Sequence, residues 1–148
     1  MRILIVNGPN LNLLGHREPD IYGSTSLEEI NRSLAQLAAA EGVEVEFVQS
    51  NHEGDIIDTL HQAQGRFDWV IINPGALAHY SLALRDAIKA ISIPTIEVHL
   101  SNIYAREGFR HQSVISDAVV GQITGLGIIG YKLALMAAIR WGKDDFQS

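Results

Sequence analysis

Short apolar runs alternate along this chain with stretches in which apolar residues recur at helical spacing. The first run, Ile3 to Val6, is apolar throughout, which is typical of a strand buried on both faces of a parallel sheet. Residues 43–48 alternate apolar residues with glutamate, so we expect this strand nearer an edge of the sheet. Further runs predict strands at 69–72, 94–98 and 118–123.

The stretches between these runs predict helices. Thr25 or Ser26 can open a capping box, because a glutamate follows each of them after three positions, and the apolar repeat that follows stops at Gly42. The other predicted helices cover 56–63, about His79 to Ile91, and a long final segment through Trp141. Strands that alternate with helices in this way indicate βαβ units and a mostly parallel sheet.

The economical fold for this pattern is α/β, a flavodoxin-like three-layer sandwich. It has a five-stranded parallel sheet in the order 2-1-3-4-5, with helices on both faces. No internal repeat, low-complexity tract or linker interrupts the chain, so we expect residues 1–148 to form a single domain. Ligands bind beyond the carboxyl ends of such strands, and the loops there begin at Asn7, Gln49, Asn73 and His99.

The loop after the first predicted strand, Asn7 to Gly23, is unusually long, because most such connections have ~2 to 6 residues. Glycine and proline punctuate it as turns and hinges, and we interpret it as a lid over the site. Within it, a guanidinium held near a phenol stabilises phenolate and lowers the phenol pKa, so Arg17 with Tyr22 is a candidate activated base. The alternative is that both are ordinary surface side chains.

Composition narrows the class of function. The formal net charge of −6 argues against a nucleic-acid partner, which would need clustered excess Lys and Arg. The chain has no cysteine, which removes disulfides, thiolate nucleophiles and cysteine-bound zinc and suits a cytoplasmic location. It also lacks a signal-peptide pattern and an apolar run of ~18 residues, so we expect no membrane segment.

The fourth predicted strand carries the most informative cluster. Because side chains alternate along a strand, Glu97, His99 and Ser101 should share one face at its carboxyl end. A carboxylate next to an imidazole can orient it and hold it protonated, which would make His99 a general acid. The alternatives are a structural histidine or a metal ligand, although no HxxxH, HxH or Asp-rich spacing supports a metal.

Other polar residues follow the third and fourth predicted strands. Asn73 ends a strand and His79 would open the next helix, where both could bind hydroxyls or a carboxylate; the alternatives are a turn-forming Asn and a helix cap. Arg106 and Arg110 would share a face if their segment is helical, and guanidinium clamps carboxylates. Alternatively they are solvated charges with Glu107 as partner.

The segment Gly125 to Gly130 matches GxGxxG between a predicted strand and a helix. A dinucleotide fingerprint also needs a further strand ending in an acidic residue ~20 positions on, and too little chain follows. We therefore interpret these glycines as allowing the last helix to pack closely on the sheet or on another subunit.

Four segments together are similar to one known family. In this order and spacing, the sequence resembles the type II 3-dehydroquinate dehydratases of the shikimate or quinate pathway in NGPNLNLLGHREPDIYG, QSNHEGDIID, NPGALAHYSLALRDA and EVHLSNIYAREGFRHQS. The resemblance covers essentially the whole chain. It implies reversible anti dehydration of 3-dehydroquinate to 3-dehydroshikimate through an enolate, without a cofactor. Consistent with this route, Lys89, Lys132 and Lys143 fall in predicted helices or the tail, where none is placed to form a Schiff base.

The resemblance also implies a role for each matching residue. Tyr22 would remove a C2 proton, with Arg17 lowering its pKa. Asn10 would help to stabilise the enolate through a water, and His99, oriented by Glu97, would protonate the departing C1 hydroxyl. The implied substrate-binding residues are Asn73, His79, Asp86, Leu100, Ser101, Arg106 and Arg110.

Assembly is a further implication, since the family forms trimers joined into a homododecamer. Asp86 would then reach the site of a neighbouring subunit, and Arg106 would support loop closure. Four positions depart from the usual family pattern and bear on pocket geometry and subunit contacts, namely Ala78, Tyr80, Tyr104 and Gly108.

Two other classes of function compete with this one. A flavodoxin-like module that binds FMN or a nucleotide would need a phosphate-cradling loop rich in Ser, Thr and Gly after the first strand, where this chain has NGPNLNLLG. A purely structural assembly protein would leave unexplained why so many polar residues fall at one end of the predicted sheet.

Overall fold

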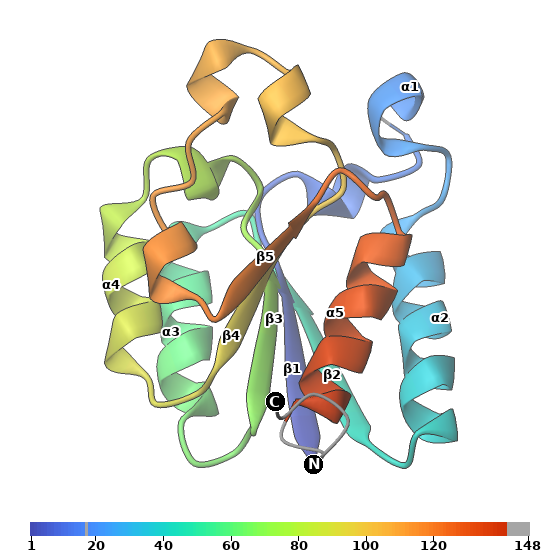
Figure 1. The fold of residues 1–148 in the computed structure, drawn as a ribbon, viewed down its shortest axis with the longest axis vertical. Helices are drawn as coiled ribbons and strands as arrows, with labels where there is room; N and C mark the ends of the chain where they lie inside the picture. Colours follow the sequence, from blue (N-terminus) through green and yellow to red (C-terminus); the bar gives the residue numbers. More distant parts are fainter. Residues whose placement is uncertain (17, 142–148) are drawn as a thin grey trace.

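A parallel five-stranded sheet in the order β2-β1-β3-β4-β5 forms the centre of the computed structural model (Figure 1). The structure describes residues 1–16 and 18–141, and of Tyr22 the backbone alone. The strands are β1 (Arg2–Asn7), β2 (Glu44–Gln49), β3 (Trp69–Asn73), β4 (Thr95–His99) and β5 (Gly121–Thr124). The predicted fold class and strand order are therefore confirmed, with β2 at an edge.

Helices cover both faces of the sheet (Figure 1). On one face lie α2 (Leu27–Ala40) and α5 (Ile129–Arg140), and on the other α3 (Glu53–Ala63) and α4 (Leu82–Ala90). The continuous apolar run of β1 follows from this arrangement, because Ile3 and Ile5 pack under α2 and α5 while Leu4 and Val6 pack under α3 and α4. Among the described helices, none is long and apolar enough to cross a membrane.

Of the two predicted capping residues, Ser26 caps the start of α2. Its Oγ accepts a hydrogen bond from the backbone N–H of Glu29 at 3.2 Å. The helix ends just before Gly42, whose φ of 72° suits a glycine after a helix.

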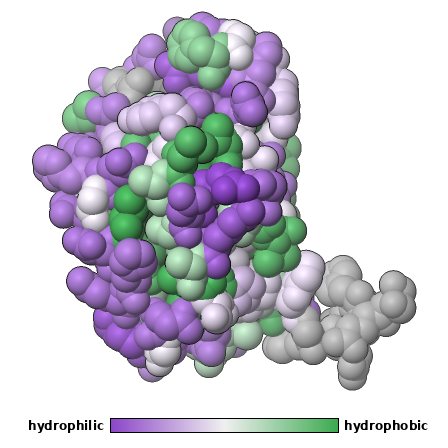
Figure 2. Space-filling view, turned by 90° about the vertical axis from the view of Figure 1, so that its left-hand side faces the viewer, coloured by the Kyte–Doolittle hydropathy of each residue, from purple (hydrophilic) through white to green (hydrophobic). Residues whose placement is uncertain are grey.

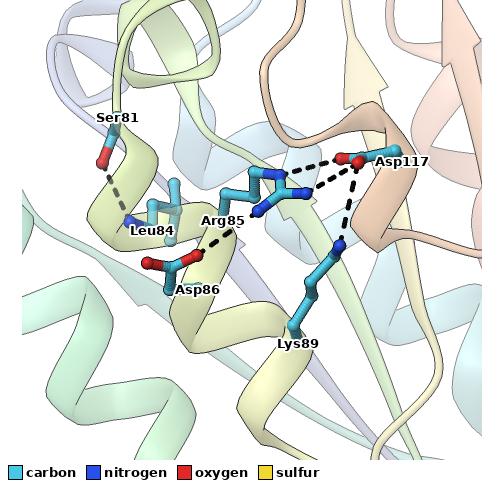
Figure 3. Close-up of polar contacts among 6 residues, drawn as sticks. All are labelled: Ser81, Leu84, Arg85, Asp86, Lys89 and Asp117. Atoms are coloured by element: carbon cyan, nitrogen blue, oxygen red, sulfur yellow. Dashed lines mark hydrogen bonds and ion pairs between the residues drawn. The ribbon is translucent and has the colours of Figure 1, made fainter.

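The start of α4 differs from the prediction. We expected this helix to begin at about His79, but Gly75–His79 forms a 3₁₀ turn and α4 starts at Leu82. The reason is Ser81, whose Oγ accepts from the N–H of Leu84 at 3.0 Å (Figure 3). The same hydroxyl donates to Glu53 of α3 at 2.5 Å. His79 is therefore not a helix cap.

The end of the chain shows smaller differences. The predicted strand at 118–123 is β5 at Gly121–Thr124, because Ser116–Ala118 forms a 3₁₀ turn before it. The last helix ends at Arg140, with Trp141 as its C-cap.

Candidate active site

A cavity of about 110 Å³ lies beyond the carboxyl ends of β1, β3 and β4, at the edge of the sheet where the sequence predicted a site. The chain order reverses between β1 and β3, so the loops that follow these strands diverge and leave room between them. The polar residues that line the cavity are Asn10, Asn73, His79, His99, Ser101, Arg106 and Arg110. Predicted polar residues from three loops are thus brought together.

Two glycines allow the first two of these loops to touch. The N–H of Gly8 donates to the carbonyl of Asn73 at 2.8 Å, and a Cβ on Gly8 would collide with the carbonyl of Pro74. Gly75 has a φ of 59°, and a Cβ there would lie 3.0 Å from the carbonyl oxygen of Pro9. This close approach forms the floor between β1 and β3.

Asn10 occupies a left-handed turn, with φ 70°, that asparagine tolerates better than most residues. Its backbone N–H donates to Oδ1 of Asn51 at 2.9 Å, and Gln49 donates to the same oxygen at 3.1 Å. The loop after β2 therefore supports the turn that places Asn10 against the cavity. This supporting role of Gln49 and Asn51 was not predicted.

The strand alternation predicted for β4 produces a buried acid and imidazole pair. Nε2 of His99 lies 2.5 Å from Oε2 of Glu97, and the two residues are 5% and 0% exposed. The same oxygen accepts a hydrogen bond from Ser113 Oγ at 2.7 Å, while Glu97 Oε1 has no hydrogen-bond partner among the described residues. The pair fixes the imidazole ring, and Nδ1 has no hydrogen-bond partner in the part of the chain that the structure describes. Such a group can transfer a proton to a bound ligand.

His79 is held beside His99. Its Nδ1 lies 2.8 Å from the carbonyl oxygen of Gln112, so Nδ1 carries the proton and donates. In the neutral ring Nε2 is then an acceptor, suited to a ligand hydroxyl. The rings of His79 and His99 are stacked, 22° apart in plane with centroids 6.2 Å apart.

The loop after β4 brings the arginines to the cavity without one continuous helix. As far as Arg110, its helical parts are two 3₁₀ turns, Ile103–Ala105 and Gly108–Arg110. Arg106 donates to Ser101 Oγ at 3.5 Å, and Nε of Arg110 donates to Glu107 at 2.5 Å. The hydrogen bond from Arg110 holds the pKa of Glu107 below its ordinary value, so this partner stays ionised at neutral pH.

Four further predicted positions remain, and of these Leu100 also lines the cavity. Leu100 is buried beside His99, and its carbonyl accepts from the N–H of Gly127 at 3.0 Å. Asp86 does not line the cavity but lies exposed on α4, where it contacts Arg85 (Figure 3). The predicted base and its partner, the Tyr22 side chain and Arg17, lie outside the described residues; the backbone of Tyr22 ends α1 (Pro19–Tyr22), and α1 stands above α2 (Figure 1).

The positions that depart from the family pattern, Ala78, Tyr80, Tyr104 and Gly108, do not line the cavity. Within the described part of the chain, no group of three or more His, Asp or Glu residues could hold a metal ion.

Beneath the cavity lies a polar chain that sequence reasoning missed. Asn73 Nδ2 donates to the hydroxyl of Tyr131 at 3.0 Å, and that hydroxyl donates to Oδ1 of Asn7. One signal for Asn7 was available, because it ends β1 opposite Asn73 in the sheet register. Tyr131 gave no signal, since an aromatic residue in an apolar helix is usually part of the core.

Comparison with known proteins finds close relatives over nearly the whole chain. Residues 1–139 match the family model described as dehydroquinase class II. A 3-dehydroquinate dehydratase of Bacillus licheniformis is 61% identical over 133 residues, which are 90% of this chain and 92% of the relative. That of Halalkalibacterium halodurans is 57% identical over 141 residues, 95% of this chain and 97% of the relative. Among solved structures, the type II dehydroquinase of Butyrivibrio crossotus superposes with a TM-score of 0.92 at 47% identity, over 93% and 97% of the two chains.

Proposed function

This chain belongs to the dehydroquinase class II family, and on that premise we propose that it is a 3-dehydroquinate dehydratase, acting as a single domain over residues 1–148. The enzyme removes water from 3-dehydroquinate to give 3-dehydroshikimate. The observation that carries the proposal is the buried Glu97 and His99 pair, whose imidazole lines a cavity where amides, imidazoles and guanidiniums converge. These groups suit a small polyhydroxylated carboxylate.

The reaction begins with loss of a C2 proton, next to the C3 ketone. Tyr22 is the base, and Arg17 lowers its pKa by stabilising the phenolate. The electrons of the broken C–H bond form an enolate on the ketone oxygen. Asn10, exposed on the turn supported by Asn51, helps to stabilise that oxygen through a water.

Elimination follows from the other side of the ring. The enolate electrons form the C1–C2 double bond as the C1 hydroxyl leaves, and His99 supplies the proton that converts it to water. Glu97 supports this step, because its carboxylate accepts a hydrogen bond from Nε2 of the ring and so fixes the orientation of the imidazole. Base and acid on opposite sides of the substrate give an anti elimination.

A lysine Schiff base is the chemical alternative for proton removal next to a ketone. Of the three lysines, Lys143 lies outside the described residues, and neither of the others lines the cavity. Lys89 lies on the surface of α4 and contacts Asp117, and Lys132 lies exposed on α5. Their positions support an enolate route without an imine.

The remaining cavity residues bind the substrate. Arg110 meets the carboxylate, while Asn73, His79, the Ser101 hydroxyl and the backbone at Leu100 and Ser101 meet oxygens of the ring. Arg106, close to Ser101, supports closure of the lid. The hydrogen bond between Arg110 and Glu107 supports this assignment, because it fixes one edge of the guanidinium and leaves the other for a ligand.

Assembly into trimers and a homododecamer is part of the proposal, as is a cytoplasmic location. On the face that includes α3 and α4, hydrophobic groups are exposed among hydrophilic ones (Figure 2). Tyr80 and Leu82, at the start of α4, are 65% and 63% exposed. Subunit contacts would cover such residues. Asp86, on the same helix, would then approach a neighbouring site.

The test mixes purified protein with 3-dehydroquinate and follows ultraviolet absorbance of the conjugated enone. We expect rapid enone formation by the wild type and its loss in a folded Tyr22→Phe variant. Borohydride added with substrate should leave the enzyme active, since no imine forms. A folded, oligomeric wild type without activity would refute the function, and borohydride inactivation would refute the enolate route alone.

A further inference from the structure

The glycine segment Gly125 to Gly130 connects β5 to the first turn of α5. Gly125 and Gly127 have φ of 89° and 62°, and a Cβ on Gly125 would lie 2.9 Å from Cβ of Asn102. At Gly130 an added Cβ would lie 3.4 Å from Ile123 of β5 and 3.6 Å from Val98 of β4. These last two distances are ordinary van der Waals contacts, so the role of these glycines in close packing of the helix stays a prediction; the next residue along α5 is Tyr131.

Tyr131 is fully buried, yet its hydroxyl reaches the polar end of the sheet. There it joins Asn73 and Asn7, which end the neighbouring strands β3 and β1 and are 3% and 1% exposed. Asn73 lines the cavity, whereas Asn7 and Tyr131 do not. Tyr131 of α5 thus contacts Asn73 on the side of Asn73 that faces away from the cavity.

The hydrogen bonds determine which way the Asn73 amide faces. Its Nδ2 donates to Tyr131, and its Oδ1 accepts from the N–H of Gly75 at 3.2 Å. The Tyr131 proton is already directed to Asn7, so a flipped amide would lose both bonds and place its NH₂ against the Gly75 N–H. Burial raises the pKa of Tyr131 above its ordinary value, so its hydroxyl is protonated and acts as a donor at neutral pH.

With one N–H and one lone pair engaged, the Asn73 amide keeps one of each for a ligand in the cavity. We propose that Tyr131 is a positioning residue for substrate binding, which orients the Asn73 amide toward a ring hydroxyl of the substrate. The proposal rests on the proposed function for the identity of that substrate. It gives the GLGIIGY segment a role in the reaction that its sequence pattern does not indicate.

The test compares Tyr131→Phe with the wild type in steady-state kinetics. Phenylalanine keeps the ring and removes only the hydroxyl. We expect KM for 3-dehydroquinate to rise about tenfold, the size expected when one oriented hydrogen bond is lost, with kcat changed by less than about twofold. A role only in stability would lower Tm and leave KM unchanged.

Two further variants make the result specific. Ile139→Ala, in the buried part of α5 two turns away, should lower Tm without changing KM. Tyr131→Phe combined with Asn73→Ala should have the KM of Asn73→Ala alone, because Tyr131 acts through that amide. An unchanged KM in Tyr131→Phe, or effects that multiply in the double variant, would overturn the proposal.

Failure of the proposed function would be visible separately, as a wild type that does not dehydrate 3-dehydroquinate. The side-chain amide protons of Asn73, assigned by their absence in Asn73→Ala, then provide the readout by nuclear magnetic resonance. We expect them to shift and exchange faster with solvent in Tyr131→Phe, but not in Ile139→Ala. Unchanged signals would show that Tyr131 does not hold the amide.

Discussion

Nε2 of His99 and Oε2 of Glu97 lie 2.5 Å apart in an environment that excludes most water. The carboxylate accepts a hydrogen bond from the Nε2 N–H and carries a negative charge beside the ring, whereas an amide of the same shape is neutral. The geometry also holds the ring in one orientation. Both effects are needed by a general acid, so their loss should appear in kcat.

Replacing Glu97 by Gln tests this relationship. We expect Glu97→Gln to lower kcat by ~10²-fold or more, within the range for general acid catalysis, with little change in KM. Kinetics at several pH values, beside thermal unfolding, would separate this effect from misfolding. If Glu97→Gln combined with His99→Asn were much slower than His99→Asn alone, Glu97 would have a role apart from the imidazole.

Ser113 donates to the same carboxylate oxygen at 2.7 Å and supports its position. We expect Ser113→Ala to lower kcat by about three- to tenfold, the effect of one lost hydrogen bond, with KM unchanged. Ser113→Thr keeps the hydroxyl and should restore most of the rate. Equal kcat in the alanine variant and the wild type would show that Glu97 is held by other contacts.

The fold was predictable where local pattern and packing agree. The apolar run of β1 and the alternation of β2 reflect how many faces of each strand are covered. The start of α4 was misplaced because it depends on a bond between Ser81 and Glu53, which are 28 residues apart. The sequence pattern does not reveal that Ser81, and not His79, is the polar residue that caps α4.

Part of the candidate site was also predictable from the sequence. Topology alone gathers Asn73 and His99 at one edge, because parallel strands end together. Tyr131 and Ser113 were missed because their roles arise from packing, with partners 58 and 16 residues away. In the sequence, a tyrosine in an apolar helix resembles a core residue and a serine in a loop resembles a surface residue.

Asp117 provides a prediction about pH. Its hydrogen bonds from Arg85, at 3.0 and 2.8 Å, lower the pKa of its carboxyl group (Figure 3). A lowered pKa in the folded state stabilises the fold above the ordinary value of 3.8, and this contribution disappears as pH falls through the folded-state value. We expect Asp117→Asn to lower Tm at pH 7 by at most about 3 °C, since the pair is exposed.

The difference between Asp117→Asn and the wild type should shrink as pH falls below 3.8 and disappear at the lower pH where Asp117 of the folded protein is itself neutral. Thermal unfolding at pH 7, 5 and 3 measures this trend. Lys89→Met serves as a control, because Lys89 lies 3.7 Å from the same carboxylate and should contribute less than Arg85. A difference that grows toward acid would contradict the assigned direction.

The contact between the loops after β1 and β3 can be tested with a pair of glycine substitutions. Gly8→Ala places a methyl group against the carbonyl of Pro74, in backbone that has little freedom to move. Gly54→Ala, in α3, meets nothing within 4 Å. We expect Gly8→Ala to lower the free energy of unfolding by about 2 kcal/mol and Gly54→Ala to raise it by about 0.5 kcal/mol.

Enzyme activity should also differ between Gly8→Ala and Gly54→Ala. The methyl group on Gly8 separates Asn10 from Asn73, so Gly8→Ala should raise KM for 3-dehydroquinate about tenfold or more, while Gly54→Ala leaves it unchanged. Urea unfolding and steady-state kinetics on the same preparations give both quantities. Gly8→Ala could instead unfold at the same urea concentration as the wild type and keep the wild-type KM. That result would show that the close contact between the loops after β1 and β3 does not shape the cavity.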